Sequence, residues 1–217
     1  LGNVVKGYRK MAKLKLNPGD VFPIPTVKDG EYGFFLSRTI RTGPCATIEV
    51  FEKFHTDFLI RPEEALAQTQ DLRARLFAPI YAVFLFDKMC GPTKWPVLAR
   101  NPEYRESLSN VDEITFLPPD FEERGVYVKG EDFLKDATKT LVAERSTIWQ
   151  QHQLVFRVGY YMSGLFRKGQ VFNLGEVTGE LFKKGLLTDA TNDAIAISEA
   201  VAQKFKLASL QKVRGGL

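Results

Sequence analysis

Residues 19–35 read GDVFPIPTVKDGEYGFF and hold the clearest strand and turn signals of the chain. Strand-forming residues run from Asp20 to Thr26, where Pro23 and Pro25 suit an edge strand or a bulge. The tetrapeptide Lys28-Asp29-Gly30-Glu31 favours a tight turn, because Asp-Gly readily adopts the positive φ that hairpin turns require. With a return strand from Tyr32 to Thr42, the stretch predicts an antiparallel β-hairpin.

Further short strands follow along the chain. Ala46 to Phe54 alternates apolar and charged residues, which is typical of a half-buried antiparallel strand. Pro62 followed by two glutamates predicts the start of a short helix. The other predicted strands cover Pro79–Phe86, Trp95–Leu98, Glu113–Leu117 and Gly125–Gly130. This spacing predicts a twisted antiparallel sheet or a partly open β-barrel.

The chain changes character from Glu131 onwards. Helical spacing fits Asp132, Phe133, Leu134, Ala137, Thr138 and Leu141, and Ser146 is a candidate N-cap for a helix through Val158. Phe182-Lys183-Lys184-Gly185 is typical of a helix end, and Thr188 or Asn192 is a candidate cap for a last helix over 194–206. We therefore expect an α+β protein in three parts: a basic tail (1–12), a β-rich domain (13–130) and a helical domain (131–217).

The composition is ordinary for a soluble globular protein, with 44% apolar and 26% charged residues among 217. The longest apolar run, Ala78 to Phe86, is half of the about 18 residues that a membrane-spanning helix needs. Leu1 to Leu16 is basic and lacks the continuous apolar stretch of a secretory signal. We expect no membrane association and a cytoplasmic location.

The net charge of +4 conceals an uneven distribution. Residues 1–15 carry five basic and no acidic side chains, residues 16–139 have a net charge of −5, and residues 140–217 a net charge of +4. Seven carboxylates gather within 21 residues: Asp112, Glu113, Asp120, Glu122, Glu123, Glu131 and Asp132. An acidic middle between basic ends argues against reading the whole molecule as a nucleic-acid binder.

Candidate catalytic residues are few. Two enzymatic arrangements are to be considered, His55 with Asp57 and Cys45 with His55 across a hairpin, but no oxyanion or nucleophile-elbow motif surrounds either cysteine. Cys45 and Cys90 are expected to be reduced, and with two histidines they do not have the spacing of a zinc site. The glycines at 159, 164 and 169 lack the order of a phosphate-binding loop. We expect a non-enzyme without metal or cofactor.

Several short sequence motifs of the β-rich part occur in a recognisable order. They are Gly19-Asp20-Val21-Phe22 with Ile24-Pro25, Gly30 through Tyr32-Gly33-Phe34, Ile48-Glu49-Val50-Phe51, Val83 to Phe86, and Trp95-Pro96-Val97. This series resembles the bacterial immunity protein 26 family, whose members accompany the toxins of polymorphic toxin systems. The resemblance spans residues 14–127 and consists of glycine and aromatic positions without a catalytic signature. The predicted helical part falls outside it.

The resemblance implies neutralisation of a cognate toxin by tight, stoichiometric binding. Many antibacterial toxins are nucleases with basic clefts, and an acidic surface could occupy such a cleft and speed association. The predicted contact residues are therefore Asp112, Glu113, Asp120, Glu122 and Glu123, with Phe121 and Trp95 as aromatic anchors. Phe116 and Tyr127 are further anchor candidates. The alternative is that the carboxylates form a solvated loop and the aromatic residues belong to the core.

The runner-up function is a nucleic-acid-binding or regulatory protein-interaction module. Lys6, Arg9, Lys10, Lys13 and Lys15, with Tyr8 among them, could contact phosphates or serve as a solubilising tail. Binding driven by phosphates would weaken steeply as salt rises, whereas a desolvated protein interface would weaken far less. The sequence leaves the oligomeric state open.

Overall fold

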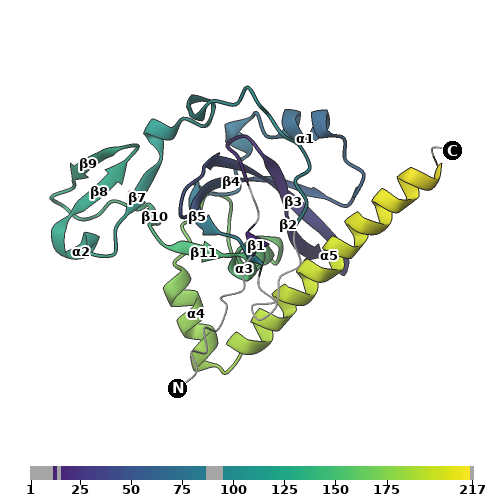
Figure 1. Cartoon of the computed structure of the whole chain (residues 1–217). Helices are drawn as coiled ribbons and strands as arrows, with labels where there is room; N and C mark the ends of the chain where they lie inside the picture. The colour runs from purple at the N-terminus through teal and green to yellow at the C-terminus, as the bar shows by residue number, and fades with distance from the viewer. Residues whose placement is uncertain (1–11, 14–15, 87–94, 216–217) are drawn as a thin grey trace, which may run out of the picture.

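The computed structural model describes residues 12–13, 16–86 and 95–215. Cys90 and residues 1–11 of the predicted basic tail lie outside these ranges. Figure 1 shows a curled sheet flanked by helices and a second, smaller sheet to one side. The predicted α+β class, a curled β-rich unit followed by helices, is confirmed.

The larger sheet has five strands in the order β11-β5-β4-β3-β2. Neighbouring strands are antiparallel, except that β11 runs parallel to β5. The predicted hairpin is present, since Asp29 and Gly30 have φ of 50° and 81° and Lys28 pairs with Glu31. The strands are β2 (Val21–Lys28), β3 (Glu31–Arg41), β4 (Ala46–His55), β5 (Ile80–Val83) and β11 (Ile148–Gln150).

The larger sheet curls into a half-barrel. The pairing of β3 with β4 shifts register twice, between Phe35 and Ser37 and between Thr39 and Arg41. Such irregularities bend a strand and increase its twist. A two-stranded pair, β1 (Ala12–Lys13) with β6 (Leu85–Phe86), lies apart from this sheet. The partly open barrel predicted from the strand spacing therefore has a local cause in the β3–β4 bulges.

Helices cover the curled sheet. The α-helices of this part are α1 (Pro62–Gln68), α3 (Gln151–Met162), α4 (Leu174–Lys183) and α5 (Leu187–Gly215), and a 3-10 turn covers Leu72–Ala74. Pro62 occupies the first turn of α1 as predicted. The helix end predicted near Gly185 is also present, because α4 stops at Lys183 and Gly185 has a φ of 71°.

One hydrophobic core joins the two halves of the sequence. Leu154, Val155 and Val158 of α3 pack in the same cluster as Phe22 and Ile24 of β2. A second cluster joins Val201 and Phe205 of α5 to Phe34 and Leu36 of β3. The suggested boundary at residue 130 falls in the turn between two strands of the smaller sheet, so the chain on both sides of it contributes to one sheet.

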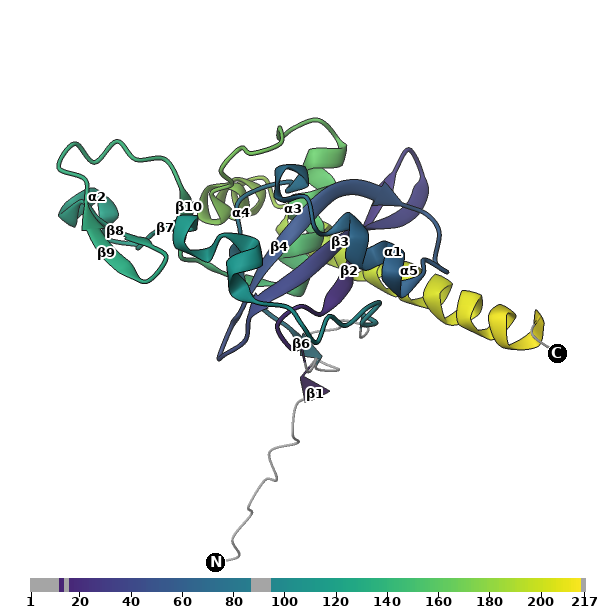
Figure 2. The same ribbon diagram turned by 90° about the horizontal axis from the view of Figure 1, so that it is seen from above.

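The smaller sheet has four strands in the order β10-β7-β8-β9. Its strands β7, β8 and β9 are antiparallel, and β10 runs parallel to β7. Both views place it to one side of the body, away from the far end of α5 (Figures 1 and 2). Its strands are β7 (Thr115–Leu117), β8 (Val126–Lys129), β9 (Asp132–Lys135) and β10 (Glu144–Arg145). The 3-10 turns Glu106–Ser109 and Val111–Glu113 precede β7, and the short helix α2 (Phe121–Arg124) connects β7 to β8.

Four element predictions are wrong. The helix expected from Asp132 is strand β9, because Gly130, with a φ of 61°, turns the chain back along β8. Ser146 caps no helix, since residues 148–150 form β11 and the side chain of Gln153 accepts a hydrogen bond from the Gln150 N–H at 2.7 Å. The strand expected over 95–98 is reduced to a bridge between Ala99 and Val21. The last helix begins at Leu187, ahead of either predicted cap.

Candidate partner-binding surface

We define residues 111–145, which contain the smaller sheet, as the sheet lobe. A small apolar cluster fixes the lobe to the body: Val111, Ile114 and Phe116 pack with Ile40 of β3. The ring of Phe116 also stacks on Tyr81 of β5, with 4.4 Å between the ring centroids. The lobe is therefore a fixed projection of the body.

A buried ion pair also attaches the lobe. Arg157 of α3 donates through both terminal nitrogens to the carboxylate of Glu144 on β10, and both side chains are buried. The guanidinium lies over the ring of Phe77 at 3.6 Å and near the ring of Trp149 at 4.8 Å. Aromatic faces attract a desolvated cation. The Glu144 carboxylate and the two rings therefore offset the cost of burying the charge of Arg157.

A second buried ion-pair network supports the base of the lobe. Glu49 of β4 accepts hydrogen bonds from Arg38 at 2.5 Å, Arg75 at 2.6 Å and the Ser109 hydroxyl at 2.7 Å. Arg75 in addition donates to the Ser109 carbonyl at 2.6 Å. A single buried carboxylate thus orders two arginines and the turn that leads into the lobe.

The seven clustered carboxylates separate into two groups at opposite ends of strand β8. Asp112 lies at the turn end, because a Cβ on Gly130 would come within 3.0 Å of its Cα. Four residues form this turn end: Asp112, Glu113, Glu131 and Asp132. Asp120, Glu122 and Glu123 lie on or beside α2, which precedes β8. Four strand residues separate the two groups, which is about 13 Å along the strand.

Two of the four turn-end carboxylates lack an ion pair within the described ranges. Glu113 pairs with Lys129 at 2.7 Å, and Glu131 reaches Arg41 at 3.4 Å. Asp112 and Asp132 are exposed and form no ion pair with any residue that the structure describes. Exposed and unpaired carboxylates of this kind are free to attract a basic partner.

The α2 end is more nearly neutralised. Asp120 pairs with Arg124 at 2.9 Å, and both carboxylate oxygens of Glu122 accept hydrogen bonds from Arg145. Glu123 is exposed, and its carboxylate forms no ion pair within the described ranges. Of the two groups, the turn end is the stronger candidate for attracting a cationic surface.

The Arg145 hydrogen bond lowers the pKa of Glu122 from 4.5 to about 2. A lowered carboxyl pKa in the folded state contributes stability above the unfolded pKa, and that contribution is lost as pH falls from 4.5 toward about 2. In Arg145→Gln, we expect the Glu122 pKa to return toward 4.5, as followed by its side-chain carboxyl resonance in an NMR titration. A titration midpoint that stayed near 2 in the variant would contradict this pairing.

The two predicted aromatic anchors belong to the core. Trp95 is 0% exposed and packs edge-on against Phe84, and Phe121, the first residue of α2, is 2% exposed. Phe116 is buried against Tyr81, and Tyr127 is half-buried. The prediction of Trp95 and Phe121 as contact residues is corrected, because neither side chain can reach a partner's surface in this fold.

Phe133 on β9 is an exposed aromatic residue that sequence reasoning missed. Its side chain is 79% exposed, and in the sequence it comes directly after Glu131 and Asp132 of the turn end. The helical spacing assigned to 132–141 concealed it. The signal that could have found it is the sequence Lys129-Gly130-Glu131-Asp132 after a strand, since glycine in the first of two turn positions favours a hairpin.

The enzymatic arrangement does not assemble. Cys45 immediately precedes β4 and His55 ends it, so the length of the strand separates them. His55 stacks on Phe34 with 5.3 Å between centroids, and burial lowers its pKa. Asp57 accepts a hydrogen bond from the N–H of Leu59 at 2.8 Å. Across the described ranges, no group of three or more histidine, cysteine, aspartate or glutamate side chains could hold a metal ion.

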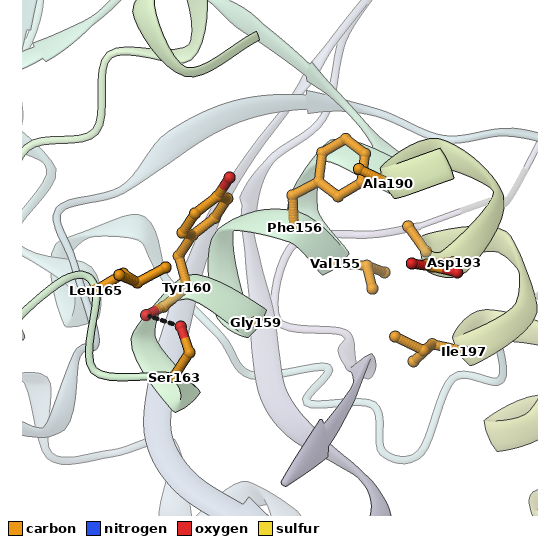
Figure 3. Close-up of a pocket in the computed structure, with 10 residues that line it drawn as sticks. Val155, Phe156, Gly159, Tyr160, Ser163, Leu165, Ala190, Asp193 and Ile197 are labelled. Atoms are coloured by element: carbon orange, nitrogen blue, oxygen red, sulfur yellow. Dashed lines mark hydrogen bonds between the residues drawn. The ribbon is translucent and has the colours of Figure 1, made fainter. Parts of the chain in front are cut away.

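Two cavities offer little reactive chemistry. A groove of about 240 Å³ between α3 and α5 is lined mainly by apolar side chains such as Phe156, Leu165 and Ile197, with Asp193 at its edge (Figure 3). A cleft of about 310 Å³ between lobe and body contains Arg75 and Glu144, whose charges are already paired. Neither cavity displays an unpaired nucleophile and base together.

Among the described residues, none of the helices combines the length and apolar character that crossing a membrane requires.

Comparison with protein-family models, with curated proteins and with solved structures found no match for this chain.

Proposed function

We propose that this protein is an immunity protein that neutralises a cognate bacterial toxin in the cytoplasm by stoichiometric, non-catalytic binding. The toxin in this proposal is a protein with a basic surface, such as a nuclease cleft. The immunity protein covers that surface and forms no covalent bond with the toxin.

The observation that carries the proposal is the turn end of the sheet lobe. The exposed carboxylates of Asp112, Glu131 and Asp132 lie at the turn that precedes Phe133, whose side chain is also exposed, on a part of the molecule that projects from the body. Binding sites in proteins commonly combine an apolar anchor with charges that complement the partner. This combination of an exposed aromatic side chain with exposed carboxylates supports a role in recognition.

Charge reversal at the turn end tests this role. The variant Asp112→Lys, Glu131→Lys, Asp132→Lys should bind the inactivated product of the adjacent gene about 100-fold more weakly, mainly through slower association. Surface plasmon resonance at two salt concentrations measures both rates. The wild-type association rate should fall as salt rises, because exposed charges are screened.

A matched control places the same charge change at the α2 end. Asp120→Lys, Glu122→Lys, Glu123→Lys should weaken binding by less than about 10-fold, because two of these carboxylates are already paired. Equal losses in the two variants would show a general charge effect and remove the turn end as the contact surface. A folded wild-type protein that forms no complex with the adjacent gene product would contradict the proposed function.

The runner-up is a nucleic-acid-binding or regulatory protein-interaction module. The sheet lobe gives the nucleic-acid version no support, since residues 111–145 carry nine acidic and five basic side chains and would repel phosphates. A regulatory protein partner would use the same turn end, and identification of the bound protein separates it from a toxin.

A further inference from the structure

Strand β9 is the outer edge of the four-stranded sheet. The sheet order ends at β9, and the structure places no other described strand beside it. All four of its residues are exposed, and both views show it on the outside of the lobe (Figures 1 and 2). Half of the backbone N–H and C=O groups of an edge strand lack a partner strand.

The hairpin register identifies which backbone groups face outwards. Only Gly130 and Glu131 separate Lys129 from Asp132, so this pair closes the hairpin with hydrogen bonds and every second pair along it does the same. The Asp136 N–H donates to the Gly125 carbonyl at 2.8 Å, which continues that alternation. The N–H and C=O groups of Phe133 and Lys135 therefore point away from β8.

The opposite side of β8 confirms this alternation. The Gly130 N–H donates to the Ile114 carbonyl at 2.9 Å, toward β7. Residues of β8 alternate between their two neighbours, so Gly130 and Val128 face β7 while Lys129 and Tyr127 face β9. The assignment of Phe133 and Lys135 to the free edge thus has two independent supports.

Charge favours one kind of strand beside β9. Asp132 begins the strand, Glu131 precedes it, and Asp112 lies beside the same turn. A second copy of this chain would bring two acidic lobes together, and such like charges oppose pairing. A basic strand would instead gain attraction from these carboxylates, while its apolar residues could pack beside the ring of Phe133.

We propose that β9 accepts an extended basic segment of the partner protein as an added fifth strand of this sheet. Backbone hydrogen bonds to Phe133 and Lys135 hold the segment, and the turn-end carboxylates select basic residues in it. This inference rests on the proposed function for the partner's identity, but the recognition mode can be measured without the toxin.

The decisive variant is Lys135→Pro. Proline removes the outward N–H of residue 135 and leaves the hydrogen bonds between β8 and β9 intact, since edge strands accept proline at such positions. Lys135→Gln is the matched control, because it removes the same charge but keeps the N–H. Leu134→Pro removes an inward N–H and reports the effect of a broken hairpin on the backbone resonances.

The probe is an end-blocked octapeptide of alternating lysine and valine, added to the isotope-labelled full chain. We expect the Phe133 and Lys135 amides to shift and to exchange about 10-fold more slowly in wild type. Lys135→Pro should bind about 10-fold more weakly, and Lys135→Gln within about 3-fold of wild type. An octapeptide of alternating glutamate and valine should bind at least about 10-fold more weakly.

Several results would overturn strand addition. They are equal binding by Lys135→Pro and Lys135→Gln, equal binding of the acidic peptide, shifts confined to other elements, and no binding at about 1 mM peptide. Concentration-dependent dimerisation that Lys135→Pro abolishes would also overturn it, in favour of a second copy.

The toxin experiment separates the two proposals. A wild-type complex with the adjacent gene product that Lys135→Pro leaves unchanged would support the proposed function and overturn strand addition. If the basic peptide adds to β9 but no complex with that product forms, strand addition is supported and the immunity function fails.

Discussion

Replacing Glu49 with alanine is expected to lower the free energy of unfolding by about 3–5 kcal/mol. Glu49 is fully buried and accepts hydrogen bonds from Arg38, Arg75 and the hydroxyl of Ser109. Its removal leaves two guanidinium groups at the base of the lobe without their carboxylate. Removing one partner of a buried ion pair is costly because the remaining charge stays desolvated.

Urea unfolding followed by tryptophan fluorescence measures this change. Glu180→Ala serves as a matched control, since it removes one partner of the exposed Lys183 pair, and exposed pairs contribute less than about 1 kcal/mol. A Glu49→Ala variant as stable as Glu180→Ala would show that water or side-chain movement compensates the two arginines. The prediction would then be wrong.

Glu144→Ala is expected to cost a similar amount, about 3–5 kcal/mol. Arg157 is fully buried and is held between its carboxylate partner and the rings of Phe77 and Trp149. The aromatic faces compensate part of its charge, but no aromatic ring replaces two charge-assisted hydrogen bonds.

A double variant separates the buried charge from the lost packing. Glu144→Leu with Arg157→Met fills similar volume without any charge, and buried ion pairs replaced in this way commonly lose little stability. We therefore expect the double variant to regain at least about 2 kcal/mol over Glu144→Ala in the same urea titration. If the double variant and Glu144→Ala were equally stable, lost packing and not the buried charge would account for the lower free energy of unfolding.

The parts of the fold that follow from local chemistry were predictable. The Asp29-Gly30 turn, the proline at the start of α1 and the glycine after α4 each require a particular backbone conformation, and each occurs where the sequence places it. The alternation in β4 also indicated its strand. These signals lie within a few residues of the structure that they determine.

Other parts depend on distant contacts. The strand β11 has three residues and forms by pairing with β5, more than sixty positions earlier, so no local pattern marks it. The chain over 132–135 has apolar residues compatible with a helix, and the turn at Gly130 with the pairing to β8 decides otherwise. Tertiary context overrides weak local preference in such short segments.

The candidate surface was predicted in part. The carboxylates were correctly found to be grouped in sequence, but their division between two ends of β8 depends on the folded hairpin. Trp95 and Phe121 were chosen because large aromatic residues are frequent in interfaces, and the same residues are frequent in cores. Only the solvent exposure of each ring separates the two cases, and within the sheet lobe it gives Phe133 in their place.

The position of β11 has a consequence for synthesis of this protein on the ribosome. Until residues 148–150 have left the exit tunnel, the side of β5 opposite β4 has no neighbouring strand. The nascent chain then exposes an unpaired, apolar edge strand that can pair with the wrong partner. Parallel pairing over so long a loop is also a slow step in folding. Translation arrested before this point should therefore yield polypeptide that aggregates or recruits chaperones, whereas release beyond α3 permits closure.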